Sequence, residues 1–321
     1  MNIRKRPKPI TLAKIKAANR RISPHFKRRN DLKKEEENRK KGYLGELQVD
    51  RYVNNYFAPT YTVLEDLCWK VNEFTTCQID TTITTPHALF FLEVKNYTGT
   101  VTFDTNFNQL IRSDGSKEIG YRYPITQAEN QKFNLHNHLV HNGYHNIPIY
   151  YFVVFSDPST IIKVIGDPEK ITDLVMHAES MPQKLMAIEE KIKLQGNNRI
   201  PHQQIGQALL RKSVEFDFDV LGEYGVSSHD ILTGVSCPAC GTLGMERIYG
   251  RWECKRCNHQ SKNAHLYAIE DYLLLVRPWI TNKEFMKFTH ITSRYIATRL
   301  LQSSGLYYDK KHNRWIKDKR R

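Results

Sequence analysis

The spacing of apolar residues along this chain alternates between that of strands and that of helices. Residues 90–94 form a nearly continuous apolar run, which is typical of a strand buried on both faces. A turn at residues 84–87, which contains Pro86, separates this run from the one before it. Runs of this kind predict strands at residues 61–67, 77–83, 88–94, 101–103, 148–155 and 161–165.

Before and between these strands, apolar residues recur every three or four positions, which is the spacing of one helical face. Leu44, Leu47 and Val53 show this spacing before Pro59 ends the pattern. Helices are predicted at residues 30–58, 124–140, from about 167, 182–194 and 201–212. Strands flanked by helices predict an α/β fold.

The C-terminal residues 264–321 have a pattern of their own. The elements predicted there are helices at residues 264–276, from about 281 and at 293–302, and strands at residues 306–308 and 314–316. The two strands flank a basic turn, so they predict a hairpin. Helices followed by a hairpin resemble a winged helix, which binds DNA. A protein-interaction domain is the alternative.

Charge separates the N-terminus from the rest of the chain. The 321 residues carry a net charge of +14, but residues 1–41 hold 16 Lys/Arg and four Asp/Glu, a net charge of +12. Such a segment is either a solvated tail or an arm that binds phosphate groups. We predict a basic tail at residues 1–40, of which residues 1–30 are expected to be loosely ordered in isolation. The sequence leaves the order of this tail within the protein undetermined. Nucleic acid is the predicted partner, with DNA preferred and RNA left open.

No apolar run reaches the roughly 18–20 residues of a membrane span, and the charged N-terminus lacks the apolar core of a secretory signal. Six cysteines are too few in a chain of this length for a disulfide scaffold. We therefore expect a cytoplasmic protein with no membrane partner. The sequence leaves the oligomeric state undetermined.

Two acids and a lysine lie on predicted neighbouring strands. Glu93 and Lys95 are two positions apart, so their side chains point to the same face of a strand. If the turn is centred between Pro86 and His87, Asp80 pairs with Glu93, and their Cβ atoms lie about 4.5–5.5 Å apart. A slip of one residue in this register would separate the two acids.

Two carboxylates this close repel each other unless a cation lies between them or one is protonated. Oxygen ligands favour Mg²⁺ or Mn²⁺, which polarises a phosphate and lowers the pKa of a bound water. Lys95 would orient that water or stabilise developing charge. The helical Glu46 would complete the metal shell or hold a second ion. Alternatively, these charges only keep an exposed surface soluble, although Glu93 follows a buried run, where unpaired charge is costly.

Four motifs follow one another along the chain: Gly45-Glu46, Gln78-Ile79-Asp80, Phe91-Leu92-Glu93-Val94-Lys95-Asn96-Tyr97-Thr98-Gly99 and Pro124-x-x-Gln127. These motifs lie within about residues 41–155. Through them the chain resembles the NERD (nuclease-related) domain, which is related to the PD-(D/E)xK restriction-endonuclease-like superfamily. The resemblance implies a mixed sheet flanked by helices and a Mg²⁺-dependent site that cleaves phosphodiester bonds.

The family pattern also implies a role for individual residues. Asp80 and Glu93 match the metal ligands, and Lys95 matches the catalytic lysine. Glu46 matches the helical acid, and Gln127 matches a glutamine that similar nucleases place near the site. The proline that precedes the aspartate in the wider superfamily is absent here, a departure that is usual for this branch.

Four cysteines form two C-x-x-C pairs with 13 residues between the pairs, a strong signal for Zn²⁺. They are Cys237, Cys240, Cys254 and Cys257. Four thiolates close the coordination shell, so this zinc is predicted to be structural. Gly241 and Asn258 follow the pairs, at positions where the backbone can need a positive φ. The remaining Cys68 and Cys77 are expected to be buried apolar residues.

Residues 233–263 resemble a zinc ribbon with a hairpin that turns at Tyr249 and Gly250. Basic residues near it favour contact with nucleic acid, and a zinc-stapled spacer is the alternative. The predicted DNA-binding residues of the C-terminal part are Arg251, Lys255, Arg256, Arg294, Arg299, Lys310 and Lys311.

Together these features predict an α/β fold with a restriction-endonuclease-like mixed sheet flanked by helices, followed by a small zinc ribbon and a winged-helix-like module. The predicted segments are a basic tail (1–40), a NERD nuclease domain (41–178), a helical connector (179–232), a zinc ribbon (233–263) and a winged-helix-like domain (264–321). The predicted function is a Mg²⁺-dependent DNA endonuclease. The alternative is a catalytically inactive, nuclease-like protein with a DNA-binding or regulatory role.

Overall fold

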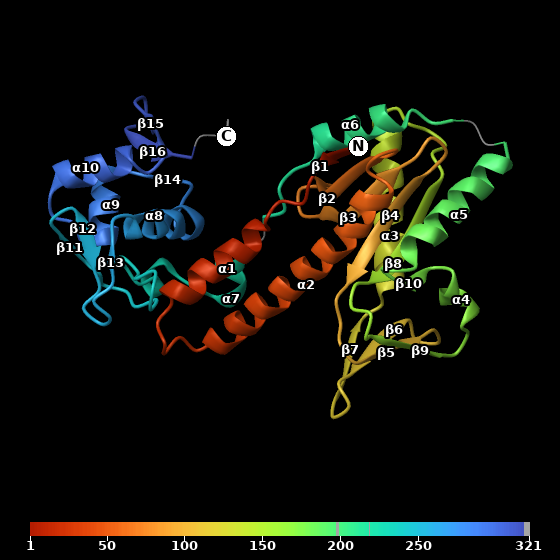
Figure 1. The fold of residues 1–321 in the computed structure, drawn as a ribbon, viewed down its shortest axis with the longest axis horizontal. Coiled ribbons are helices and arrows are strands. Elements are labelled where there is room, and N and C mark those ends of the chain that lie inside the picture. Colours follow the sequence, from red (N-terminus) through yellow and green to blue (C-terminus); the bar gives the residue numbers. More distant parts are fainter. Residues whose placement is uncertain (197–198, 218, 318–321) are drawn as a thin grey trace. The chain divides into compact units, whose positions relative to one another are not determined.

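The computed structural model describes residues 1–196, 199–217 and 219–317. Contacts within the chain divide it into two compact units (Figure 1). Unit 1 comprises Met1–Pro9 and Asn38–Phe216, and unit 2 comprises Ile10–Glu37 and Asp217–Arg321. The chain thus passes twice through each unit. The five segments predicted from the sequence stay a prediction.

A six-stranded mixed sheet forms the centre of unit 1, with strand order β1-β2-β3-β4-β8-β10. The pairs β1/β2, β4/β8 and β8/β10 are parallel, whereas β3 is antiparallel to both of its neighbours. The strands are Asn2–Arg4 (β1), Thr62–Lys70 (β2), Thr76–Thr84 (β3), Leu89–Lys95 (β4), Ile149–Phe155 (β8) and Val175–His177 (β10).

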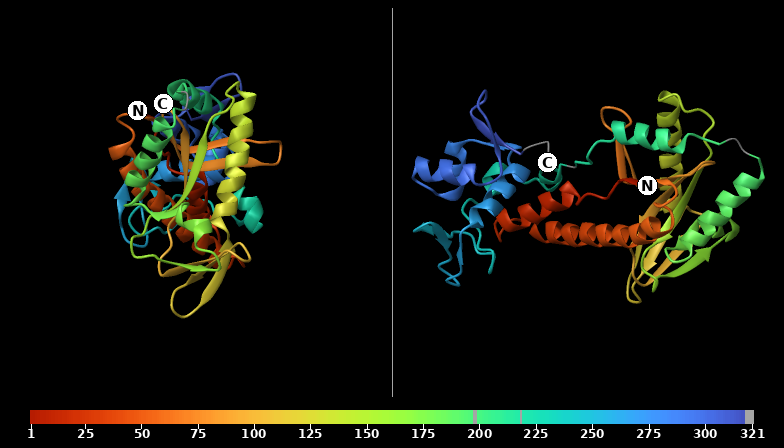
Figure 2. Two further views of the ribbon diagram at one scale, coloured as in Figure 1. Left: turned by 90° about the vertical axis from the view of Figure 1, so that its right-hand side faces the viewer. Right: turned by 45° about the horizontal axis from the view of Figure 1, so that its top comes forward.

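Helices cover both faces of this sheet because the central strands are apolar on both sides. In β4, Leu92 packs in one cluster with residues of α2 and α5. The next residue towards the N-terminus, Phe91, packs in another cluster with residues of α3 and α6. The helices are Arg29–Tyr56 (α2), Pro124–His141 (α3), Met181–Leu194 (α5) and His202–Lys212 (α6), and Figure 2 shows them beside the sheet. The predicted α/β class, with a mixed sheet flanked by helices, is confirmed.

A second, four-stranded sheet of unit 1 was predicted only in part. Its order is β7-β6-β5-β9, and its strands are Thr100–Asp104 (β5), Gln109–Ser113 (β6), Glu118–Arg122 (β7) and Ile161–Ile165 (β9). Strands β6 and β7 were missed because they are too polar to give an apolar run. The helix expected from about residue 167 is a single turn, Glu169–Thr172 (α4).

The N-terminal residues are ordered within the protein, which the sequence left undetermined. Strand β1 extends the main sheet beside β2, and the following residues form helix α1, Ile10–Arg21. Arg6 and Arg21 are both buried, and Arg21 pairs with Asp271 at 2.8 Å. The high basic content predicted solvation, but carboxylates distant in sequence neutralise these two arginines.

Unit 2 contains the C-terminal elements that the sequence predicts. Two three-stranded sheets have the orders β11-β12-β13 and β14-β16-β15. Thr281 and Glu284 form a capping box at the start of α9. The elements are Val220–Tyr224 (α7), Ser228–Asp230 (η1), Glu246–Ile248 (β11), Arg251–Glu253 (β12), Gln260–Ser261 (β13), Ala264–Leu275 (α8), Trp279–Ile280 (β14), Asn282–Thr289 (α9), Arg294–Gln302 (α10), Tyr307–Asp309 (β15) and Arg314–Ile316 (β16).

Among the helices of the described residues, none has both the length and the apolar composition that a membrane crossing requires.

Candidate functional site

Strands β3 and β4 part at the candidate site. Thr81 pairs with Leu92, which is the register that the turn predicted for Asp80 opposite Glu93. The ladder ends at this pair. Just beyond it, the backbone amide of Val94 donates a hydrogen bond to Oδ2 of Asp80 at 2.7 Å. The Asp80 carboxylate is therefore fixed against β4 at the point where the two strands separate.

Glu93, Lys95 and Gln127 form a closed hydrogen-bonded group at the end of β4. Nζ of Lys95 donates to Oε1 of Glu93 at 2.6 Å and to Oε1 of Gln127 at 3.1 Å. Nε2 of Gln127 donates to the same Glu93 oxygen at 2.8 Å. Glu93 is only 3% exposed, so each of these contacts replaces water on a buried carboxylate. The structure thus brings three of the five predicted catalytic residues into direct contact.

Gln131, one helical turn after Gln127, was missed by the sequence reasoning. Its Nε2 donates to Oε2 of Glu93 at 2.7 Å and to the backbone oxygen of Gln78 at 2.9 Å. Both acceptors face the amide nitrogen, which fixes the orientation of the side chain. Two glutamines four positions apart share one helical face, and this spacing was the signal available in the sequence.

Glu46 reaches the same end of the sheet from helix α2. A Cβ on the preceding Gly45 would lie 2.5 Å from Cβ of Asn96 and 2.6 Å from Oγ of Ser156. Only glycine therefore allows α2 to come this close to the ends of β4 and β8. Among the described residues, Glu46 makes no hydrogen bond to the other four predicted catalytic residues, and its partner is Arg6.

Arg6 joins α2 to β3 beside these acids. Its Nη1 donates to Oε2 of Glu46 at 2.8 Å, and its Nε and Nη2 donate to the two carboxylate oxygens of Asp50 at 2.7 and 2.9 Å. Nη2 also donates to the backbone oxygen of Asp80 at 2.8 Å and to Oγ1 of Thr81 at 3.0 Å. No local pattern predicts this network, because Arg6 is 40 residues from Glu46 in the chain.

The acids of the site disfavour one another's ionisation. Burial raises the pKa of Asp80 well above its ordinary value, and the negative charges of Glu93 and Glu46 raise it further. Burial also raises the pKa of Glu46, although Arg6 opposes this shift. Burial alone would lower the pKa of Lys95, but the Glu93 carboxylate more than offsets it, so the pKa is raised and the ammonium form is favoured.

These carboxylates suit a hard divalent cation. Their mutual repulsion is the condition that a cation relieves, and oxygen atoms are the donors that Mg²⁺ and Mn²⁺ prefer. Among the described residues, one group of three or more possible metal ligands has all its ligand atoms within 4.8 Å of one another, and its members are cysteines. The oxygens of Glu46, Asp80 and Glu93 are therefore not all this close together. The chemistry of the donors fits a metal, and Asp80 and Glu93 stay its predicted ligands.

A polar hollow of about 730 Å³ opens beside the glutamines. Side-chain amides dominate its lining, which has a single charged residue. The lining residues that matter here are Gln78, Arg122, Gln127, Asn130, Gln131, Asn134 and Phe216. The hollow gives a ligand with many hydrogen-bonding groups a place next to Gln127 and Gln131, which bind Glu93.

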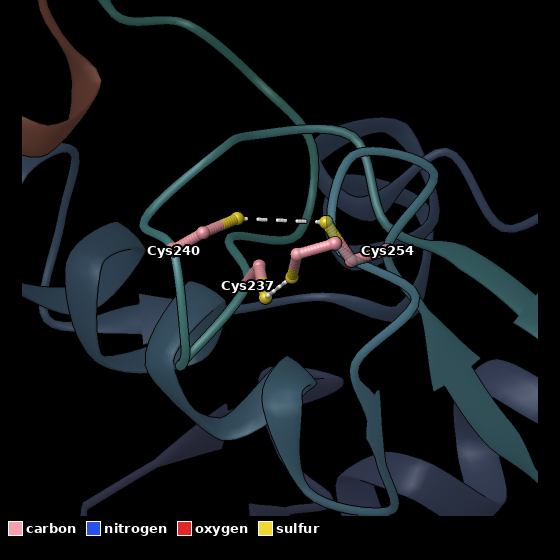
Figure 3. Close-up of side chains that lie close together, drawn as sticks. Cys237, Cys240 and Cys254 are labelled. Atoms are coloured by element: carbon pink, nitrogen blue, oxygen red, sulfur yellow. Dashed lines mark hydrogen bonds between the residues drawn. The ribbon is translucent and has the colours of Figure 1, made fainter.

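The four predicted zinc ligands converge in unit 2, with all sulfur atoms within 4.8 Å of one another. The sulfurs of Cys240 and Cys254 are 3.6 Å apart and point toward each other (Figure 3). Those of Cys237 and Cys257 are 3.7 Å apart. Tetrahedral zinc with bonds of about 2.3 Å would hold sulfurs about 3.8 Å apart, so this cluster can hold zinc.

The backbone around the cysteines has the shape expected of two turns that hold thiolates. Gly241 has φ +71° and Asn258 has φ +55°, which confirms the positive φ expected after each pair. The hairpin β11–β12 turns at Tyr249 and Gly250, both also with positive φ.

The predicted DNA-binding residues all lie on the surface of unit 2. Some are engaged with neighbours, because Lys255 pairs with Glu246 and Arg256 donates to Oγ1 of Thr242 at 3.2 Å. The set comprises Arg251, Lys255 and Arg256 near the zinc ribbon, Arg294 and Arg299 on α10, and Lys310 and Lys311 between β15 and β16. Their contact with DNA stays a prediction.

A mixed sheet with helices on both faces, and an acid–lysine pair at the end of a buried strand, define a nuclease-like α/β domain. Residues 41–156 match the family model of the nuclease-related domain, NERD. The family predicted from the sequence is thereby confirmed for this stretch, which is less than half of the chain. No curated protein and no solved structure matches the chain.

Proposed function

We propose that this protein is a metal-dependent nuclease that hydrolyses phosphodiester bonds in DNA. The proposal rests chiefly on one observation: Glu93, Lys95 and Gln127 form a hydrogen-bonded group next to Asp80, inside the stretch that matches the nuclease-related domain. In this proposal Asp80 and Glu93 hold Mg²⁺ or Mn²⁺, and Glu46 contributes from α2.

Each side chain has a defined task in this reaction. Lys95 keeps its proton, because Glu93 favours its charged form, so it stabilises negative charge on the phosphate rather than removing a proton. Gln127 holds Lys95 and Glu93 together, and Gln131 holds the second oxygen of Glu93. A bound Mg²⁺ or Mn²⁺ would polarise the scissile phosphate and lower the pKa of water at the site.

The remaining parts of the chain would bring the nucleic acid to this site. The amide-lined hollow beside Gln127 and Gln131 offers hydrogen bonds to a nucleotide. In unit 2, the cysteine cluster would bind Zn²⁺ as a structural ion. The zinc ribbon and the winged-helix-like module would then present their exposed basic residues to the DNA backbone. Paired thiolates suit a reducing compartment, so we expect the protein in the cytoplasm.

A catalytically inactive, nuclease-like DNA-binding or regulatory protein is the second candidate. One observation favours it: two of the acids are already paired with cations of the chain itself. Glu93 pairs with Lys95 at 2.6 Å and Glu46 pairs with Arg6 at 2.8 Å. If the Glu93–Lys95 pair keeps Glu93 from binding divalent metal, the site stays internally neutralised and does not cleave.

A substrate panel distinguishes the two candidates. Supercoiled plasmid, single-stranded DNA and RNA of the same sequence are incubated with the protein in Mg²⁺, Mn²⁺ or EDTA. A nuclease cuts at least one DNA substrate with metal and none with EDTA. Binding of DNA without cleavage under any metal condition favours the inactive alternative, and cleavage of RNA alone corrects the substrate class.

A further inference from the structure

We infer that the N-terminal arm, defined as Met1–Pro9, contributes to the nuclease centre. In this inference Arg6 is a positioning residue that holds Glu46 and Asp80 in place. This inference rests on the proposed function. The family match begins at residue 41, so the arm is contributed by this chain from outside the matched domain.

The arm is held in place by contacts that do not involve the site. Strand β1 pairs in parallel with β2, and Nδ2 of Asn2 donates to Oδ1 of Asn54 at 2.8 Å and to Oε1 of Glu65 at 2.6 Å. Nη1 of Arg4 donates to Oγ of Ser213 at 2.7 Å. These contacts place the arm whether or not Arg6 contributes to catalysis.

Arg6 then reaches from the arm into the site. Its side chain is 1% exposed. Its planar guanidinium group bridges helix α2 and strand β3, which carry Glu46 and Asp80. It binds Glu46 and Asp50 on α2, and it binds the backbone oxygen of Asp80 on β3. Through Arg6, the helical acid and the strand that carries the metal-binding aspartate are held by one rigid group.

The geometry of Arg6 suits positioning better than charge compensation alone. A lysine would supply the same charge, but only the guanidinium fork can bind both oxygens of Asp50 and still donate to Glu46 and Asp80. Outer-shell partners of this kind hold metal ligands in orientation, and their loss typically costs about 10- to 100-fold in metal affinity or activity.

Two variants and a control test the inference in the full-length protein. Arg6→Lys keeps the charge and Arg6→Met removes it, and Arg4→Met is the matched control. Arg4 also anchors the arm, through Ser213 and the backbone oxygen of Glu65, but it touches neither Arg6's partners on α2 nor Asp80. The measurements are thermal unfolding, kcat and KM for cleavage, and Mn²⁺ affinity from the free-ion paramagnetic resonance signal without DNA.

We expect Arg6→Lys to stay folded, to lose about 10-fold or more in kcat with little change in KM, and to bind Mn²⁺ about 10-fold more weakly. Arg4→Met should lower the unfolding temperature while kcat and Mn²⁺ affinity stay within about 3-fold of wild type. If Arg6→Met does not fold, the results for Arg6→Lys alone test the inference.

The inference is overturned if Arg6→Lys cleaves and binds Mn²⁺ as wild type does, or if Arg4→Met loses as much kcat as Arg6→Lys. Either result would show that the arm stabilises the fold without positioning the site. A wild-type protein that cleaves no nucleic acid with any metal is a different outcome, because it removes the proposed function itself.

Discussion

At the scale of single residues, the candidate site consists of charges that few other positions in the fold would tolerate. Glu93 is almost completely buried, yet both of its oxygens accept hydrogen bonds, two on Oε1 from Lys95 and Gln127 and one on Oε2 from Gln131. Oε2 therefore keeps an acceptor position that a metal ion can use. Asp80 has one backbone hydrogen bond and two negative neighbours. Such an arrangement is costly for stability alone and is useful where a cation is to be bound.

The raised pKa of Asp80 predicts that metal binding depends on pH. Near the ordinary pKa of an aspartate, about 4, Asp80 still carries its proton, so a cation must displace that proton to bind. Affinity for Mn²⁺ should therefore tighten as the pH rises above this value, by up to about tenfold per unit while one proton is displaced. Titrations of the protein with Mn²⁺ from pH 5 to 8 measure this slope.

The control for this prediction is Asp80→Asn, which has no proton to displace. It should bind Mn²⁺ more weakly, and the part of the slope that belongs to Asp80 should disappear. An affinity that is the same at pH 5 and pH 8 in the wild-type protein would contradict the raised pKa.

Strand geometry and the family resemblance were enough to predict part of the candidate site. The two-residue period of β4 places Glu93 and Lys95 on one face, and the symmetry of the turn sets the register opposite Asp80. Gln127 came from the family pattern. Arg6 and Asp50 were not predictable, because their contact joins segments 44 residues apart and no local pattern encodes such a pairing.

At the scale of elements, helix α2 has to approach the sheet closely to deliver Glu46. Two glycines lie within this helix, where glycine normally lowers stability, and they differ in their surroundings. A Cβ on Gly42 would meet nothing within 4 Å, whereas a Cβ on Gly45 would meet Asn96 and Ser156. One glycine is thus required by packing, and the other is not.

These two glycines give a matched pair of substitutions. Gly45→Ala should destabilise the protein by about 1–3 kcal/mol, because α2 must move away from the ends of β4 and β8. Gly42→Ala should stabilise it by about 0.5–1 kcal/mol, because alanine restricts the unfolded chain. Urea unfolding followed by circular dichroism measures both. Equal effects of the two substitutions would show that α2 does not pack against β4 as described.

At the scale of the whole molecule, the two candidate metal sites belong to different units. The cysteine cluster lies in unit 2, where the buried Trp252 packs in the same core cluster as Cys237 and Cys254. The carboxylates lie in unit 1. Loss of zinc should therefore destabilise unit 2 while the candidate nuclease centre keeps its structure.

Zinc content and calorimetry test this separation. The wild-type protein should contain one zinc per chain, and a strong chelator should lower the unfolding temperature of one of two transitions. Cys254→Ser should have the same effect as chelation. Cys68→Ala should keep its zinc, because Cys68 is a buried residue of unit 1. A chelator that lowers both transitions equally, or a protein without zinc, would contradict this assignment.

Most elements of both units follow from local patterns, since caps, turns and apolar spacing act over a few residues. The division into units does not. Residues 10–37 pack with the C-terminal part of the chain, and the buried pair of Arg21 and Asp271 joins positions 250 residues apart. Net charge predicted a tail there, because composition carries no information on which acids a basic residue will meet.

The role of the carboxylates is tested most directly by replacing one oxygen of Glu93. Glu93→Gln keeps the shape of the side chain but removes its charge, and Glu129→Gln is the matched control on the exposed side of α3. Initial rates of plasmid or single-stranded DNA cleavage are measured in Mg²⁺, and DNA affinity is measured in EDTA. We predict that Glu93→Gln cleaves at least about 100-fold more slowly than wild type, while its DNA affinity and the activity of Glu129→Gln are unchanged. Cleavage by Glu93→Gln at the wild-type rate would contradict the assignment of this site as the nuclease centre.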